Sequence, residues 1–417
     1  MSALNGRCVV VGVTGGIAAY KAVEVCRRLV GHGAHVVPVL TDGALRMVGE
    51  TTFSALASEP AITSLWNDRS GPIPHTAAGQ RADAVVVCPA TARLISDLRT
   101  GRSGDVLTAT LLATRAPVVL APAMHTEMWE QPSVQENLAV LTQRGVTMVG
   151  PSDGPLAGGD AGPGRMAEPT EIVAAVEAVL TVPDLAGTRV LVTSGGTREP
   201  IDAVRFVSNR SSGKQGAALA DEAAARGADV VLVTTQSERA AGVPARVVAV
   251  ETAAEMAAAV ELEAPHADLV VMAAAVADFR PAQPSGTKLK KDQGVPAVEL
   301  EPTADILAAL GASKGPGQVL VGFAAETEDI ESNAVAKLRR KNLDVIVAND
   351  VSKQHVGFGH DTNEIVMFTA DGARHHVPLT TKREAARAVL DVAVSLMGSA
   401  SGGPADDQDT SDSRERP

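Results

Sequence analysis

The chain has 417 residues, a length that predicts two or three domains rather than one core. Its net charge of −12 and its aromatic content of 2% argue against a nucleic-acid-binding protein, which needs a basic face or aromatic stacking surfaces. The three cysteines lie far apart and no apolar run reaches the ~18 residues of a membrane span. We therefore expect a cytoplasmic protein without disulfides or a zinc site.

Two parts of the chain repeat one plan. Residues 7–16 and 188–196 are β-rich runs that end in a glycine pair, and each is followed by a helical stretch, a glycine and a second β-rich run, at residues 33–41 and 227–235. Strand, glycine-rich turn, helix and strand form the βαβ unit of a parallel sheet. We predict an α/β protein with two doubly wound domains.

The first half continues with strand candidates at residues 84–88 and 117–121 and a weaker one at 146–149. A glycine- and proline-rich loop is expected at 151–166, followed by a closing helix at 171–180 with Thr170 as its N-cap. The first domain is assigned to residues 1–181 and a linker to 182–187.

The second half, residues 188–398, contains further strand candidates, which are residues 190–193, 230–233, 269–272, 319–322 and 345–347. A β-hairpin is expected at 364–379 around an Ala-Asp-Gly turn, followed by an amphipathic helix at 381–397. Residues 399–417 are rich in Ser, Gly and Asp and lack apolar anchors, so a disordered tail is predicted.

Three segments of the first half follow predicted strands. Residues 13–21 (VTGGIAAYK) combine backbone N–H groups with a helix N-terminus, which suits an anion, although an ordinary strand-to-helix turn is equally compatible. The segment lacks the GxGxxG dinucleotide fingerprint. Residues 88–93 (CPATAR) and 121–129 (APAMHTEMW) follow the next two strands. The carboxyl ends of strands in an open α/β sheet meet at a ligand crevice.

With GPGRM at residues 162–166, these strings resemble the flavodoxin-like FMN-dependent cysteine decarboxylases of the phosphopantothenoylcysteine branch. The resemblance covers residues 1–181 and implies FMN as the cofactor. The residues it places at FMN are Gly15, Gly16, Ile17, Ala18, Thr41, Pro89, Ala90 and Thr91.

His75 lies in a segment that we expect to be a loop, where a lone histidine is usually a surface residue. The resemblance instead assigns to His75 the catalytic base of the family. It also implies the chemistry: FMN oxidises the substrate thiol, so that loss of CO2 leaves a stabilised enethiolate.

The first half departs from the family at two positions. His125 stands where the family has asparagine, and Gly158 stands where it has the cysteine that donates the last proton. The resemblance places His125, Met128, Gly158 and Asp160 at the decarboxylase substrate. Cys88 is an alternative donor, but a cysteine that ends a buried strand is more often part of the core.

In the second half, residues 193–202 and 206–216 offer backbone amides and the hydroxyls of Ser208, Ser211 and Ser212, which suit a polyphosphate, although either string alone is compatible with an ordinary polar loop. Residues 288–291 (KLKK) place Lys288 and Lys290 on one side of an extended segment, or on a solvated face. Lys337 and Lys341 share one face of a helix.

From about residue 186 to 398 these strings, in their order, resemble phosphopantothenate–cysteine ligase, and the fold implied is Rossmann-like with the added β-hairpin. The resemblance implies CTP as co-substrate, with Mg2+ held through its phosphates. Asn209 would hold an acyl-cytidylate and Lys288 would be catalytic. The CTP site would comprise Ser211, Ser212, Gly213, Met272, Ala273, Ala274, Asp278, Lys288, Ala304, Asp305, Ile306, Leu307, Phe323, Lys337 and Lys341.

Together the two resemblances indicate a bifunctional enzyme of coenzyme A biosynthesis. A redox or regulatory binding protein and a prenyl-flavin synthase-like enzyme are the alternatives, and neither needs KLKK or the 206–216 loop. By resemblance, decarboxylase trimers and ligase dimers would assemble into a dodecamer. No metal role is expected for the pairs His355/His360 and His375/His376, because they are expected on a loop and a hairpin without acidic companions.

Overall fold

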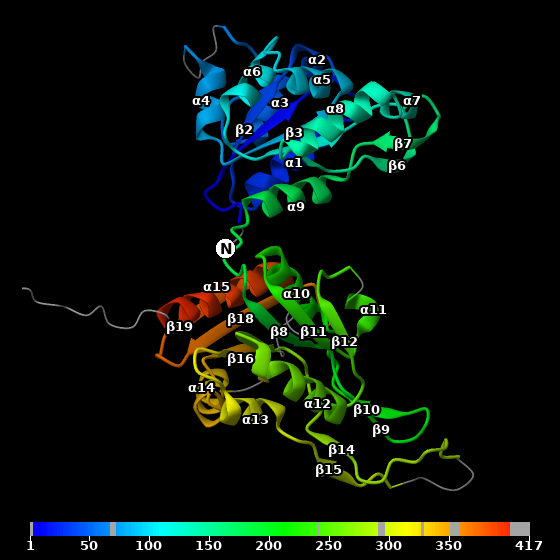
Figure 1. Ribbon diagram of the computed structural model, residues 1–417, viewed down its shortest axis with the longest axis vertical. Helices are drawn as coiled ribbons and strands as arrows, with labels where there is room; N and C mark the ends of the chain where they lie inside the picture. The colour runs from blue at the N-terminus through cyan, green and yellow to red at the C-terminus, as the bar shows by residue number, and fades with distance from the viewer. Residues whose placement is uncertain are drawn as a thin grey trace, which may run out of the picture. The chain divides into compact units, whose positions relative to one another are not determined.

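The computed structural model describes residues 3–66, 72–240, 242–290, 297–326, 329–350 and 359–400. The chain divides into two compact units, residues 1–181 and 182–417. Each unit is an α/β structure built on one central sheet (Figure 1). Residues 399 and 400, the first two of the predicted tail, are the last residues of the final helix. The rest of the predicted tail, from residue 401 onward, lies outside the described residues.

The first unit contains a five-stranded parallel sheet in the order β2-β1-β3-β4-β5. Its strands are β1 (Cys8–Val13), β2 (His35–Leu40), β3 (Ala84–Ala90), β4 (Val118–Pro122) and β5 (Thr147–Met148). This order is that of the flavodoxin-like doubly wound fold. The predicted flavodoxin-like class is confirmed.

Helices cover both faces of this sheet because its central strands are apolar on both sides. Val9, Val11 and Val13 pack with one set of helices, and Val10 packs with the other. The first set is α1 (Ala19–Gly31), α3 (Glu50–Leu56) and α9 (Pro169–Leu180); the second is α4 (Pro74–Arg81), α5 (Ala92–Thr100), α6 (Val106–Ala113) and α8 (Pro132–Gln143). Two short helices, α2 (Asp42–Leu45) and α7 (Thr126–Trp129), follow β2 and β4.

Three local predictions in this unit are wrong. The expected loop at 151–166 contains a two-stranded antiparallel hairpin, β6 (Ser152–Pro155) and β7 (Ala161–Arg165), which lacks the apolar alternation by which a strand is normally recognised. The N-cap of α9 is Glu168 rather than Thr170, because Pro169 already occupies the first helical turn. His75 lies in helix α4, which begins at Pro74, and not in a loop.

The second unit contains an eight-stranded sheet in the order β12-β11-β8-β13-β16-β17-β18-β19. Its strands are β8 (Arg189–Ser194), β11 (Asp229–Thr234), β12 (Arg246–Ala249), β13 (Leu269–Met272), β16 (Val319–Glu326), β17 (Val345–Asp350), β18 (Thr362–Thr369) and β19 (Arg374–Thr381). The first six are parallel in the 3-2-1-4-5-6 order of a Rossmann fold, and the last two form an antiparallel hairpin. The predicted class and hairpin are confirmed.

Helices α10 (Lys214–Ala225) and α15 (Lys382–Ala400) cover one face of this sheet. Helices α12 (Ala253–Glu263), α13 (Ile306–Ser313) and α14 (Ile330–Arg340) cover the other. Buried Glu222 on α10 accepts a 2.7 Å hydrogen bond from the Arg387 side chain on α15 and so joins the two helices of the first face. The expected linker belongs to this unit, where Leu185 is buried and Asp184 pairs with Arg226.

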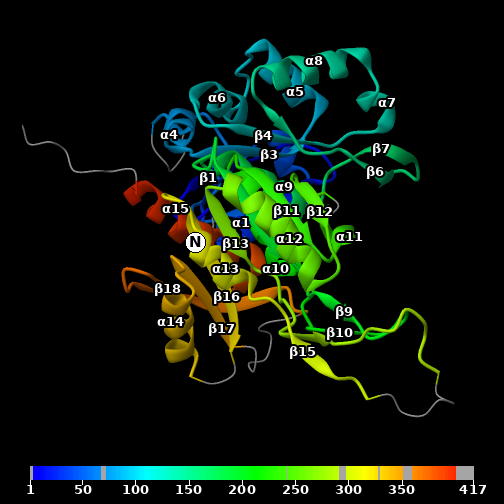
Figure 2. The same cartoon turned by 60° about the horizontal axis from the view of Figure 1, so that its bottom comes forward.

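Two small hairpins follow the carboxyl ends of this sheet and were not predicted. They are β9 (Arg198–Pro200) with β10 (Phe206–Ser208), and β14 (Phe279–Pro281) with β15 (Leu300–Pro302). Figure 2 shows them side by side beyond the body of the sheet, and β9 contacts β14. Strands of three residues are too short for a periodic sequence signal. The remaining short elements are α11 (Ser237–Ala240) and a 3-10 turn at Ala264–His266.

Candidate active sites

In the first unit, the turns after β1, β2 and β3 come into direct contact. A Cβ added to Gly15 would lie 2.9 Å from backbone atoms of Gly43, and one added to Gly16 would lie 3.2 Å from the Pro89 ring. Only glycine allows such an approach at Gly15. The structure thus brings the eight residues expected at FMN to three adjacent turns at the carboxyl end of the sheet.

The hydroxyl groups of two threonines, Thr41 and Thr14, form hydrogen bonds that order these turns. The Thr41 hydroxyl accepts a hydrogen bond from Ala44 N (3.2 Å) and caps α2, whereas Thr91 caps α5 without a side-chain hydrogen bond to the helix. Thr14 donates to the carbonyl oxygen of Pro89 (2.6 Å) and so joins the first turn to the third. The N-terminus of α1 and the exposed side chain of Ile17 complete the edge.

His75 lies in the first turn of α4 and is half-buried. The other end of α4 lies near the start of β1, where Asp83 N donates to Cys8 O (2.7 Å). The helix therefore runs antiparallel to the strands, and His75 lies toward their carboxyl ends. Its Nδ1 atom is buried and has no hydrogen-bond partner among the described residues.

The turn after β4 carries His125 and Met128, and the hairpin tip carries Gly158 and Asp160. The hairpin is fixed to this turn because Met124 N donates to Gly164 O (3.0 Å) and the Thr126 hydroxyl donates to Pro163 O (3.0 Å). His125 Nδ1 lies 3.9 Å from Asp160 Oδ2. All four residues expected at the decarboxylase substrate therefore lie in two segments that contact each other.

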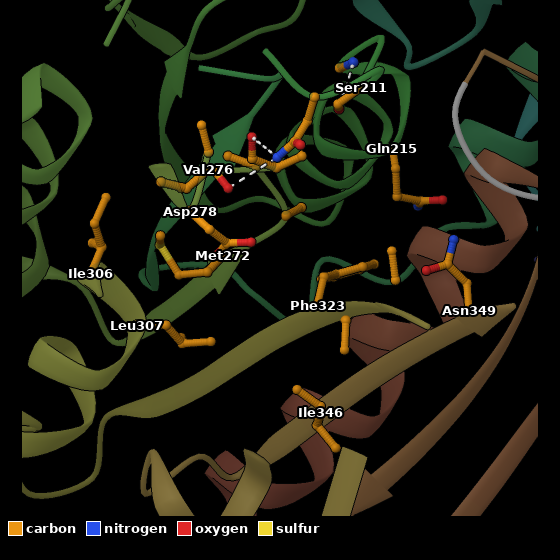
Figure 3. Close-up of a pocket in the computed structure, with 18 of the residues that line it drawn as sticks. Ser211, Gln215, Met272, Val276, Asp278, Ile306, Leu307, Phe323, Ile346 and Asn349 are labelled. Atoms are coloured by element: carbon orange, nitrogen blue, oxygen red, sulfur yellow. Dashed lines mark hydrogen bonds between the residues drawn. The ribbon is translucent and has the colours of Figure 1, made fainter. Parts of the chain in front are cut away.

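The second unit contains a cavity of about 560 Å³ at the carboxyl end of its sheet (Figure 3). All the residues expected to bind CTP, except Lys288, line it, and Asn209 lines it as well. These are Asn209, Ser211, Ser212, Gly213, Met272, Ala273, Ala274, Asp278, Ala304, Asp305, Ile306, Leu307, Phe323, Lys337 and Lys341. They come from the N-terminus of α10, the segment after β13, the start of α13, β16 and the end of α14.

Hydrogen bonds fix the polar wall of the cavity. The Asn209 side-chain amide nitrogen donates to the carbonyl oxygens of Ala275 (3.2 Å) and Val276 (3.0 Å), and Figure 3 draws hydrogen bonds beside Val276. Both donors of the amide are used in this way, and its oxygen makes no hydrogen bond to another described residue. Asp305 accepts from Ala308 N (3.0 Å) and from Lys341 Nζ (2.9 Å). Burial acts to raise the pKa of Asp305, but the hydrogen bonds from Lys341 and Ala308 N, together with the positive charges of Lys341 and Arg340, outweigh it, and the pKa is lower than usual.

Lys288 does not line the cavity. It lies in an exposed segment whose backbone is tied to buried Asp202: Leu289 N donates to Asp202 Oδ2 (3.1 Å), and Arg205 donates to Leu289 O (2.8 Å). The hydrogen bond from Arg205 lowers the pKa of Asp202 far below its usual range. Lys288 and Lys290 are both exposed, on either side of half-buried Leu289; Lys291 lies outside the described residues.

Several cavity residues were missed. Lys214, Gln215, Asn349, Asn363 and Lys382 line its other end. Gln215 donates to Lys382 O (3.1 Å) and accepts from Asn363 (3.2 Å), and Figure 3 shows the amides of Gln215 and Asn349 facing the cavity. Two signals were available: Asn349 lies just after a predicted strand, and Lys214 and Gln215 lie within residues 206–216, which were expected to suit a polyphosphate.

The expectation that the paired histidines lack acidic neighbours is wrong for His376, whose Nε2 lies 3.1 Å from Glu364 Oε1 on the adjacent strand. The residue opposite His376 is Val366, and Glu364 lies two residues further along β18, so the contact depends on strand register and not on sequence distance. His355 lies outside the described residues. Among the residues with described positions, no three His, Cys, Asp or Glu side chains form a cluster that could hold a metal ion.

Family comparisons agree with this division of the chain. Residues 2–181 match the family "Flavoprotein", and residues 185–396 match the family "DNA/pantothenate metabolism flavoprotein C-terminal domain". The two folds and the two matches define a flavoprotein with a second, pantothenate-metabolism domain. No helix in the described ranges is both long and apolar enough to cross a membrane.

Curated relatives match along nearly the whole chain. The coenzyme A biosynthesis bifunctional protein CoaBC of Mycobacterium tuberculosis is 46% identical over 413 residues, which cover 94% of this chain and 97% of the relative. The Bacillus subtilis protein of the same name is 43% identical over 399 residues, covering 94% and 98%. The chain therefore belongs to the family of bifunctional coenzyme A biosynthesis proteins CoaBC.

A crystal structure of the C-terminal domain of a CoaBC protein is 40% identical, with a TM-score of 0.44, and covers 52% of this chain and 99% of that chain. A phosphopantothenoylcysteine (PPC) decarboxylase mutant complexed with pantothenoylaminoethenethiol is 28% identical, with a TM-score of 0.37, covering 41% and 97%. Family membership makes the chain a bifunctional flavoenzyme with a decarboxylase and a phosphopantothenate–cysteine ligase activity.

Proposed function

We propose that the two units catalyse consecutive reactions. The second unit joins 4′-phosphopantothenate to L-cysteine with CTP, and the first unit decarboxylates the resulting phosphopantothenoylcysteine with FMN to give 4′-phosphopantetheine. The observation that carries the proposal is the cavity of the second unit, where residues from five separate segments surround one space of about 560 Å³. A cavity of that size suits a nucleotide.

The ligase reaction begins with attack of the pantothenate carboxylate on the α-phosphate of CTP, which forms an acyl-cytidylate and releases pyrophosphate. The cysteine amine then attacks the acyl carbon and CMP leaves. Both steps need neutralisation of phosphate charge more than covalent help. Lys337 and Lys341 supply positive charge within the cavity, and the free oxygen of Asn209 orients the intermediate.

Lys288 acts from the exposed segment that Asp202 and Arg205 anchor. The backbone of the neighbouring Leu289 is hydrogen-bonded to Arg205 and Asp202, whereas the side chain of Lys288 is exposed. In the proposal its ammonium group reaches a bound triphosphate while these backbone hydrogen bonds are kept. Mg2+ binds through the phosphates of CTP. The proposal assigns no protein ligand to it.

The first unit has a shape that fits FMN. The contact between Gly15 and Gly43 and the N-terminus of α1 suit a phosphate group, and exposed Ile17 offers an apolar surface to a flat ring. Bound flavin supplies reversible two-electron chemistry. The protein residues bind and orient it through Gly16, Thr41, Pro89, Ala90 and Thr91, and His75 removes the proton of the substrate thiol.

The proposal places the enzyme in the cytoplasm as a homo-oligomer, a dodecamer of decarboxylase trimers and ligase dimers. The experiment that tests the function is incubation of the full chain with phosphopantothenate, cysteine and CTP. We expect phosphopantothenoylcysteine, 4′-phosphopantetheine and CMP by mass spectrometry. Release of ADP or AMP from ATP with no use of CTP would contradict the ligase assignment.

The flavin assignment has its own test, because residues 1–181 form a compact unit. The purified protein should be yellow, and a fragment of residues 1–181 should retain FMN. Flavin that stays with residues 186–417 instead would contradict the assignment.

A further inference from the structure

The carbon that loses CO2 in the proposed decarboxylation must gain a proton. The bond between Cα and the carboxylate breaks, its electron pair remains with the organic product, and CO2 leaves. The product CH2 group then carries one hydrogen that came from an acid. The net reaction is phosphopantothenoylcysteine plus one proton giving 4′-phosphopantetheine plus CO2. The protein therefore needs a proton donor at the carboxyl edge of the first sheet.

We propose that His125 is this acid, and that Asp160 is a positioning residue that holds its ring. The assignment rests on the proposed decarboxylase function and adds to it the source of the last proton. A protonated imidazole gives its proton to the carbon and regains one from water. Atoms and charge then balance over each turnover.

The turn that carries His125 is in contact with the turns assigned to flavin. Ala123 N donates to Ala90 O (3.2 Å), so the segment after β4 is hydrogen-bonded to the segment after β3. A Cβ on Gly16 would in turn meet Pro89 and the methyl group of Thr91, which links the segment after β1 to the same place. Only one residue, Met124, separates Ala123 from His125. The imidazole thus belongs to the edge where the substrate must meet the flavin.

Asp160 approaches from a different element. The β6–β7 hairpin is hydrogen-bonded to the His125 turn through Met124 and Thr126, and this contact places Asp160 Oδ2 3.9 Å from His125 Nδ1. Asp160 lies on the Nδ1 side of the ring, and the other ring nitrogen, Nε2, is on the opposite edge of the imidazole. Gly158 lies beside the ring, since a Cβ there would be 3.8 Å from His125 Cε1. The ring is bordered by a residue without a side chain.

Three other acids of the first unit are engaged or enclosed. Lys21 pairs with Glu168 at 3.0 Å. Cys88 and Cys26 are fully buried, and burial raises the pKa of the Cys88 thiol to about 12. His75 serves as the base for the thiol in the proposed function. His125, by contrast, is about half exposed, so that both water and substrate can reach it.

The test uses the full-length flavin-loaded protein and supplied phosphopantothenoylcysteine, without oxygen. For His125→Ala we expect flavin content and the first release of CO2 to be kept, while formation of saturated product falls about 10²-fold. A thiol two hydrogens lighter than 4′-phosphopantetheine accumulates, in an amount equal to the flavin, and the flavin absorbance bleaches. Added imidazole should restore the saturated product, because it replaces the missing acid. It would not do so if His125 had only a structural role.

His35→Ala is the matched control, because His35 is also an exposed histidine beside a carboxylate, Glu59, but lies at the amino end of β2. It should form saturated product as the parent protein does. Asp160→Asn should slow saturation by a smaller factor, and imidazole should not correct it. Saturated product at the parental ratio in flavin-loaded His125→Ala would overturn the assignment. Loss of CO2 release with flavin retained would also overturn it, since His125 would then act earlier. Failure of the parent protein itself to release CO2 would instead contradict the decarboxylase function.

Discussion

Each unit begins with a strand and a glycine-rich turn, which leads directly into α1 in the first unit and through the β9–β10 hairpin to α10 in the second. The two sites nevertheless differ, because the first is formed mainly by backbone and the second mainly by side chains. At the edge of the first sheet the contacts are mostly between backbone turns, such as Gly15 against Gly43, with two threonine hydroxyls that order them. The cavity of the second unit is lined by charged side chains, among them Lys337, Lys341 and Asp305. Both sites lie where the order of strands reverses, as the doubly wound fold requires.

The difference follows from the charge of the proposed ligands. A flavin mononucleotide has one phosphate, which a helix N-terminus and backbone N–H groups can satisfy. A nucleoside triphosphate develops more charge during transfer and needs cations to neutralise it. The first site should therefore be sensitive to the addition of a Cβ, and the second to the loss of a positive charge.

The largest expected effect is the separation of the two activities by single substitutions. Lys288→Gln should lower CMP formation about 10³-fold and leave decarboxylation of supplied phosphopantothenoylcysteine unchanged, because it removes charge at the triphosphate alone. His75→Asn should do the reverse and retain FMN. Both are measured by product mass on the same preparations.

Lys290→Gln is the control for Lys288, because both lysines are exposed on either side of Leu289. It should keep most of the ligase activity. Equal loss of both reactions in both variants would show that the two units do not have separate active sites.

A smaller effect is expected from Gly15→Ala. The new methyl group would lie 2.9 Å from the Gly43 backbone, so the turns must move apart, and flavin affinity should fall by about tenfold or more. Flavin titration of the apoprotein measures it. Gly31→Ala is the control: Gly31 ends α1 with nothing within 4 Å of an added Cβ. Normal flavin binding by Gly15→Ala would contradict a flavin site that depends on the close backbone contact between Gly15 and Gly43.

The preference for CTP over ATP is expected to be a smaller effect than that of Gly15→Ala. We expect the base to lie against Ala304, Leu307 and Phe323, which line the cavity, so that a purine, being larger than a pyrimidine, would have to displace them. We expect kcat/KM for CTP to exceed that for ATP by about tenfold. Pyrophosphate release with each nucleotide measures the ratio. Full ligase activity with ATP as the only nucleotide would contradict the expected preference for CTP.

The sequence predicted the sheets well because parallel strands are buried on both faces and give continuous apolar runs, as at residues 84–88 and 319–322. The cavity residues Met272–Ala274 and Asp278 were predicted from the resemblance to phosphopantothenate–cysteine ligase. The rule that loops at the carboxyl ends of strands meet was applied to the first unit, where it uses only chain order and needs no knowledge of side-chain contacts.

The failures have a common physical cause. The β6–β7 hairpin is held by backbone hydrogen bonds among Gly and Pro residues, and the pairing of His376 with Glu364 depends on strand register. Neither leaves a periodic apolar pattern in the sequence. The end of the cavity that contains Gln215 and Asn363 was missed because α10 and β18 are 148 residues apart at that contact. Such contacts become visible only when the sheet is assembled.

The smallest effect is expected for Cys88→Ala, which tests whether this thiol takes part in the first site at all. Cys88 is fully buried in β3, one residue before Pro89, and burial raises the pKa of its thiol to about 12. Removing one buried sulfur should lower the free energy of unfolding by about 1 kcal/mol, visible as a slightly lower Tm. The yield of saturated product per CO2 should not change, because the thiol faces the core with Cys26 and not the substrate. If Cys88→Ala instead accumulated the product two hydrogens lighter, this cysteine and not His125 would be the acid, and the site would depend on a buried side chain after all.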